Sequence, residues 1–174
     1  MGVFMVPALP RFFLLCLVVV LASCSSGSRE WKYVRNGSRT AIVIDGKAVP
    51  PANIPHAALR AVAAGNELVG KPYRMGGGHK SFKDSAYDCS GTVSYLLHHA
   101  GGLDAPTTSS ALRGYGSKGP GKWITGYARS GHTFIIVAGL RMDTGYNGSR
   151  REGPKWTTKP RPTKGYVMRH PPGL

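Results

Sequence analysis

The segment CSGTVSYLLHHAGG, residues 89–102, constrains the fold of this chain more than any other stretch. Its apolar residues recur at the spacing i, i+3, i+4 and i+7, which predicts a helix with one apolar side. These residues are Val93, Leu96, Leu97 and Ala100. Asp88 stands where the N-cap of that helix belongs, and Gly101 ends it. We therefore expect the apolar side of this helix to face a core.

The segments around this helix predict helices first and strands afterwards. A helix is expected over about 55–69, with Pro55 in its first turn, and a short helix within 108–116. Strands are expected within 40–46, 121–128, 132–139, 140–144 and 165–171, with a tight turn at Ala138–Gly139. Residues 71–88 and 145–165 are expected to be loops; the first holds three consecutive glycines. This order favours an α+β domain whose helices pack on an antiparallel sheet.

Residues 1–23 have the features of a bacterial export signal. Their apolar run, FFLLCLVVVLA, is shorter than the roughly 20 apolar residues of a membrane-spanning helix. The run ends at LASC, in which Cys24 would be lipidated, become the new N-terminus and anchor the protein in a membrane. Ser25 in place of aspartate then favours the outer membrane, on the periplasmic side. The alternative is a plain secretory signal in which Cys24 has no role.

Removal of the signal leaves 151 residues, which is enough for one domain. Residues 24–53 are expected to be a tether and lead-in. Residues 54–174 are expected to form one domain with a basic C-terminal extension, and the protein is expected to be a monomer.

The chain has a formal net charge of +15, which is usual for proteins that bind nucleic acid. An exported, anchored protein rarely meets nucleic acid, so we expect none as a partner. Anionic lipid headgroups and the carboxylates of the cell wall are the expected neighbours. A basic, soluble surface without a specific partner is the alternative.

Cys89 has no expected partner for a disulfide, because Cys16 leaves with the signal and Cys24 carries the lipid. A helix start favours the thiolate, which is the nucleophilic form of cysteine. His132 opens the most apolar strand, and a sheet packed on the Cys89 helix would bring the two together. The alternative is a buried structural thiol with an unrelated histidine. Cys89 has no neighbour at metal-ligand spacing, so neither a metal nor another cofactor is expected.

Three stretches in order, GKPYRMGGG, YDCSG and GHTFIIVAG, resemble the NlpC/P60 family of bacterial cell-wall cysteine peptidases. The resemblance covers roughly residues 55–145 and implies a papain-like fold. It implies that Cys89 is the nucleophile and His132 the base. It further implies that Tyr73 lies near the oxyanion or the substrate, and that Asp88 and Ser90 bind the free amine of a peptidoglycan stem peptide.

The third catalytic residue of that family is usually a polar one, often histidine, on the strand after the catalytic histidine. This chain has no histidine there, and its candidates are Asp143, which we favour, and Thr144. The register of the strands would decide between them. Lys155, Trp156, Lys159 and Arg161 in the C-terminal extension would either line the substrate cleft or wrap and stabilise the sheet.

The resemblance implies a thiol endopeptidase that cleaves peptidoglycan stem peptides between D-glutamate and a diamino acid. Two alternatives remain open. One is an inactive binding or scaffold lipoprotein of the same fold, and the other is a Cys–His amidase or acyltransferase that acts on a different substrate.

Overall fold

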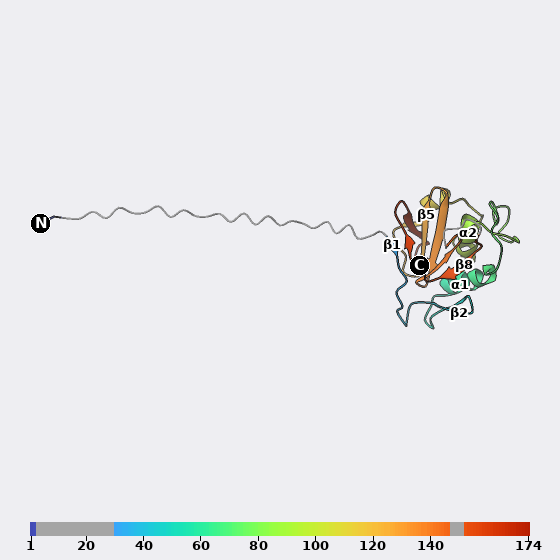
Figure 1. The fold of residues 1–174 in the computed structure, drawn as a ribbon, viewed down its shortest axis with the longest axis horizontal. Coiled ribbons are helices and arrows are strands. Elements are labelled where there is room, and N and C mark those ends of the chain that lie inside the picture. The colour runs from blue at the N-terminus through green and yellow to red at the C-terminus, as the bar shows by residue number, and fades with distance from the viewer. Residues whose placement is uncertain (3–29, 147–151) are drawn as a thin grey trace.

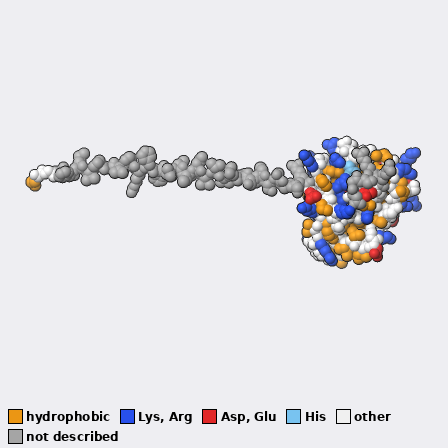
Figure 2. Space-filling model, viewed as in Figure 1, with side chains coloured by type: hydrophobic (Ala, Val, Ile, Leu, Met, Phe, Trp, Pro, Cys, Tyr) orange, Lys and Arg blue, Asp and Glu red, His pale blue; other side chains and the backbone are white. Residues whose placement is uncertain are grey.

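The computed structural model describes residues 1–2, 30–146 and 152–174 of the chain (Figure 1). Most of the expected signal, together with Cys24 and its expected lipid, lies outside the described residues. Within the described part, no helix has the length and apolar character needed to cross a membrane. Lys and Arg side chains are spread over the visible face of the molecule, and acidic side chains are few there (Figure 2).

The described residues form two α-helices, one 3-10 helix and ten short strands. The helices are α1 (His56–Leu68), α2 (Cys89–His99) and η1 (Ala111–Gly114). The strands are β1 (Glu30–Trp31), β2 (Ile42–Ile44), β3 (Lys47–Val49), β4 (Ser117–Lys118), β5 (Ile124–Arg129), β6 (His132–Val137), β7 (Leu140–Asp143), β8 (Lys155–Thr157), β9 (Arg161–Pro162) and β10 (Val167–His170).

Six of these strands form one antiparallel sheet in the order β4-β10-β5-β6-β7-β8. Two smaller pairs, β1 with β9 and β2 with β3, stand apart from it. Strands β5, β6 and β7 follow one another through tight turns, and the last strand, β10, pairs between β4 and β5. The α+β class with an antiparallel sheet is thus confirmed.

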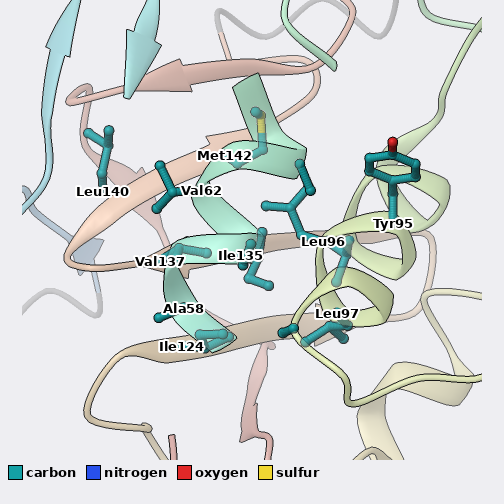
Figure 3. Packing of buried hydrophobic residues seen from close by; sticks show 14 of the residues in the cluster. Ala58, Val62, Tyr95, Leu96, Leu97, Ile124, Ile135, Val137, Leu140 and Met142 are labelled. Carbon is teal, nitrogen blue, oxygen red and sulfur yellow. The ribbon is translucent and has the colours of Figure 1, made fainter. Parts of the chain in front are cut away.

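The core lies between the two α-helices and one face of the sheet (Figure 3). Ala58 and Val62 from α1 and Leu96 and Leu97 from α2 pack there over Ile135 of β6. Each of these five side chains is at most 1% exposed. The apolar side expected for α2 therefore meets the sheet, and this contact fixes where the helix begins relative to the strands.

At strand β7 the opposite face of the sheet is buried as well. Arg141 and Asp143 alternate with Met142 along β7, yet all three side chains are buried. The guanidinium of Arg141 lies 5.6 Å from the ring centroid of Trp31 in β1. In Figure 1, β1 lies on the side of the sheet away from α2. Residues of the lead-in thus cover polar side chains of the sheet.

Residues 30–53, the described part of the expected tether and lead-in, hold strands β1, β2 and β3, and β2 lies within the strand expected over 40–46. Strand β1 pairs with β9, and the N–H of Ala41 donates to the carbonyl of Ala138 at 2.8 Å. Strands β2 and β3 form a hairpin whose turn residues, Asp45 and Gly46, both have positive φ. This segment packs on the domain because its own buried residues need a surface to cover them.

The expectation that 145–165 is a loop is wrong for its second half, which holds β8 and β9. Trp156 of β8 is 1% exposed and donates its Nε1–H to Oδ1 of Asn66 at 2.8 Å. The same amide of Asn66 bonds both backbone groups of Ala48. Trp156 therefore belongs to the core and stabilises the domain; it does not line a cleft.

Candidate active site

Helix α2 begins at Cys89 because Asp88 caps it. Oδ1 of Asp88 accepts a hydrogen bond from the N–H of Gly91 at 2.8 Å, and Asp88 has the extended backbone of an N-cap. Cys89 is a free thiol, 9% exposed, in the first turn of the helix. The partial positive charge of that turn favours the thiolate form of the side chain.

The glycine loop before α2 packs directly on this helix start. The N–H of Gly76 donates to Oδ2 of Asp88 at 2.9 Å, and the N–H of Asp88 donates to the carbonyl of Gly77 at 3.2 Å. A Cβ atom on Gly91 would overlap the carbonyl oxygen of Gly77. The Gly-Gly-Gly run and Gly91 therefore permit a close backbone approach that orients the first turn of α2.

His132 lies at the start of β6 and contacts both Asp143 and Cys89. Its Nε2 is 2.9 Å from Oδ1 of Asp143, and its side chain is 15% exposed. Burial by itself would lower the pKa of His132, but hydrogen bonds and charge from Asp143 and Cys89 outweigh it and raise the pKa. Because Nε2 faces Asp143, Nδ1 is the ring nitrogen left for the thiol of Cys89.

The register of β6 and β7 explains why Asp143 reaches His132. The two strands pair as Val137 with Leu140 and Ile135 with Met142. One further step in this register sets Asp143 across from Phe134, on the same face as His132 and diagonal to it. Of the two candidates for the third residue, it is therefore Asp143 whose carboxylate meets the ring; Thr144 is buried beside it.

The second oxygen of Asp143 is held by two arginines. Oδ2 lies 2.8 Å from Nη1 of Arg141 and 3.2 Å from Nη1 of Arg161. The Arg141 and Asp143 side chains are fully buried, and burial lowers the pKa of Arg141, the charge of Asp143 opposing that effect. These contacts fix the orientation of the carboxylate, so that Oδ1 is turned to His132. The sequence patterns gave no role to Arg141, because its contact with Asp143 depends on both side chains being buried on the same face of β7.

Asp88 and Ser90, the sequence neighbours of Cys89, are joined by His79, a residue to which the sequence patterns gave no role. Nε2 of His79 is 3.0 Å from Oδ1 of Asp88 and 3.0 Å from Oγ of Ser90. Ser90 also donates to Asp88 at 3.2 Å. The signal for His79 was its place directly after the glycine run, which the fold lays over the helix start.

Tyr73 lies beside this cluster. It forms a parallel bridge with Tyr87, two residues before Cys89, and its side chain is partly buried. Its hydroxyl lies 4.0 Å from the sulfur of Met75. The structure thus brings Tyr73, Asp88, Ser90, Cys89, His132 and Asp143 into one region of the domain.

A pocket of about 490 Å³ opens next to His132. Its lining includes Arg129, Tyr146, Arg161, Lys164 and Tyr166 as well as His132 itself. It is built from the strand ends and the C-terminal extension. Of the four extension residues for which a cleft or a stabilising wrap was left open, Arg161 alone is in this lining; Trp156 is in the core, and Lys155 and Lys159 are exposed outside this lining.

No group of three or more potential metal ligands among His, Cys, Asp and Glu occurs in the described part of the chain. The arrangement offers instead a thiol, an imidazole and a carboxylate in series. Such a series can transfer a proton from a nucleophile and return it to a leaving group.

Comparison with known proteins adds no assignment: no protein-family model matches this chain, and no curated protein matches its sequence.

Proposed function

We propose that this protein is a thiol endopeptidase of the bacterial cell wall with a papain-like arrangement of its catalytic groups. One observation carries the proposal: His132 contacts both Cys89, at the start of a helix, and Asp143, a carboxylate fixed by Arg141. A structural thiol would require neither the histidine nor its carboxylate partner. The order of the three groups is that of a nucleophile, a base and an orienting group.

In the proposed reaction the sulfur of Cys89 attacks the carbonyl carbon of a peptide bond, and His132 holds the proton that the thiol has lost. First-turn N–H groups of α2 stabilise the oxyanion of the tetrahedral intermediate. His132 then gives its proton to the leaving amine, and a thioester remains on Cys89. Water attacks the thioester as His132 takes its proton, and the carboxylic acid is released with the thiol restored.

The proposed substrate class is supported by the residues next to Cys89 and by the family resemblance. Asp88 and Ser90 place a carboxylate and a hydroxyl beside the nucleophile, and these groups suit the free amine of a stem peptide. The bond that we propose is the one between D-glutamate and a diamino acid. A lipid on Cys24 would hold the enzyme at the outer membrane, close to this polymer.

The test uses the purified full chain in detergent micelles, incubated with soluble peptidoglycan fragments and analysed by mass spectrometry. The expected result is a cleaved stem peptide that is absent with Cys89→Ala. The same product should be present with Lys47→Gln, which changes an exposed residue of β3. The masses of the two products identify the bond.

Absence of any product from a folded chain would reject the peptidase. The rate of Cys89 alkylation in wild type and in His132→Gln then identifies which alternative holds. Equal rates indicate a scaffold whose thiol is not activated, whereas a faster wild-type rate indicates an enzyme that acts on another amide or ester.

A further inference from the structure

The pocket beside His132 has a strongly positive lining. Arg129, Arg161 and Lys164 contribute cationic side chains, and no acidic residue lines the pocket within the described part of the chain. The nearby carboxylate of Asp143 is fully buried and is already compensated by Arg141 and Arg161. The pocket therefore presents a net positive field to any group that enters it.

Two of these cations are not committed to carboxylates of the protein. The ion pairs of the described residues include neither Arg129 nor Lys164. The guanidinium of Arg129 lies 5.0 Å from the ring centroid of Tyr166, which holds it at the pocket wall. Lys164 is exposed at the rim. Both charges are available to a ligand, whereas Arg161 is already held by Asp143.

The charge on the two sides of the nucleophile is opposite. One side carries Asp88, with His79 and Ser90 bonded to it. The pocket is lined by His132 but by no residue between 71 and 99, so Asp88 and Cys89 lie outside its lining, and His132 links the pocket to the nucleophile through its interaction with Cys89. A substrate that spans this pair would fit best with a positive group on one half and a negative group on the other.

The mechanism decides which half lies in the pocket. His132 gives its proton to the leaving amine, so the residue that carries this amine has to lie on the His132 side. The pocket adjoins His132, and a volume of about 490 Å³ is enough for one amino-acid residue with its side chain.

We propose that this pocket binds a carboxylate on the residue whose amine is released, through Arg129 and Lys164. The inference rests on the proposed endopeptidase function and extends it to the leaving half of the substrate. It predicts a preference for stem peptides whose diamino acid has free carboxylates over those in which the carboxylates are amidated. Amidation removes the charge but keeps the size, so the preference isolates the electrostatic contribution.

The experiment measures kcat/KM of the full chain in detergent micelles for L-alanyl-γ-D-glutamyl-diaminopimelate and for its carboxamide analogue. We expect about tenfold higher kcat/KM for the free acid, since an exposed cationic site contributes one or two charge-assisted contacts. In the double variant Arg129→Gln with Lys164→Gln the ratio should fall toward one. Lys47→Gln, which removes a charge on the distant hairpin, should keep it. Added salt should reduce the wild-type ratio.

A binding measurement keeps this inference separate from the peptidase proposal. Calorimetry of Cys89→Ala with the same two peptides should show tighter binding of the acid, again dependent on Arg129 and Lys164. That preference without any hydrolysis by wild type would support the pocket and reject the peptidase. Hydrolysis of both peptides at equal rates, or a ratio that survives in the double variant, would overturn the pocket and leave the peptidase standing. Neither binding nor hydrolysis would overturn both.

Discussion

The Nε2 atom of His132 lies 2.9 Å from Oδ1 of Asp143, on the neighbouring strand of one antiparallel sheet. Asp143 lies eleven positions after His132 in the sequence. Their contact results from the turn at Ala138–Gly139, which pairs Val137 with Leu140 and so sets the register of β6 and β7. The arrangement of this pair and its arginines leads to the first three predictions below.

Asp143→Asn should lower the upper limit of the pH range in which the protein hydrolyses its substrate. Burial lowers the pKa of His132, but Asp143 and Cys89 raise it overall, and asparagine removes the charge of Asp143. Because His132 must carry a proton to release the amine, activity is lost as pH rises through this pKa. The basic limb of kcat/KM should therefore move to lower pH, and the maximum should fall on the order of a hundredfold. Asp104→Asn, an exposed carboxylate, is the control, and an unmoved basic limb would contradict the assignment.

His132 should contribute to stability mainly at low pH. Its pKa in the folded protein is raised above the ordinary value of 6.5. The contribution is therefore complete below about pH 6.5 and is lost as pH rises through the folded pKa. The difference in unfolding free energy between wild type and His132→Gln should be larger at about pH 5.5 than at about pH 9.

Urea denaturation at several pH values measures this difference. His56→Gln, at the exposed start of α1, controls for the loss of a histidine as such. A difference for His132→Gln that is constant with pH would show that Asp143 and Cys89 do not stabilise the charged ring.

Arg141→Gln should destabilise the domain by about 3–5 kcal/mol, because it leaves the buried carboxylate of Asp143 without its closest cation. The Arg141 side chain is fully buried, and Nε and Nη2 have no hydrogen-bond partner among the described residues. Arg141 is therefore buried although two of its nitrogen atoms are not hydrogen-bonded, because its ion pair with Asp143 offsets that cost. Chemical denaturation is the measurement, with the exposed Arg39→Gln as control. A loss below about 1 kcal/mol would mean that Arg161 alone can hold Asp143.

Gly91→Ala should disturb the start of α2. Its Cβ would overlap the carbonyl oxygen of Gly77, and neither backbone segment can move without displacing Asp88 or Cys89. We expect a loss of about 1–3 kcal/mol or more and a fall in hydrolysis beyond what the lost stability explains. Thermal melting and kcat/KM are compared with Gly114→Ala, whose Cβ meets open space. Equal behaviour of the two variants would argue against the close approach.

Trp156→Ala should cost about 3–5 kcal/mol, since it removes a large core side chain and its bond to Asn66. Met168→Ala, on the partly exposed strand β10, should cost only about 0.5 kcal/mol. The two midpoints of urea unfolding give the comparison. If Trp156→Ala instead left stability intact and weakened only substrate binding, the tryptophan would belong to the cleft.

Local patterns were enough to predict the elements that carry the site. The spacing of Val93, Leu96 and Leu97 predicted α2, and Asp88 predicted its first turn, because helix periodicity and capping depend on neighbouring residues. The apolar run after His132 predicted β6 in the same way. The sequence also marked Asp143 as a candidate partner of His132 and predicted the turn at Ala138–Gly139, but it left Thr144 open, because the register of β6 and β7 depends on the exact geometry of that turn.

The contacts between distant segments depended on the tertiary structure. Only the fold places His79 against Asp88, buries Arg141 beneath β1, inserts β10 between β4 and β5, and gathers Arg129, Arg161 and Lys164 around one pocket. In each of these contacts, the local sequence around one residue has no pattern from which the position of its partner could be predicted. The sequence thus determined which residues begin the helix and the strands, because those preferences are local. The packing of the whole chain decided which side chains share a site, because that depends on how all the apolar faces are covered at once.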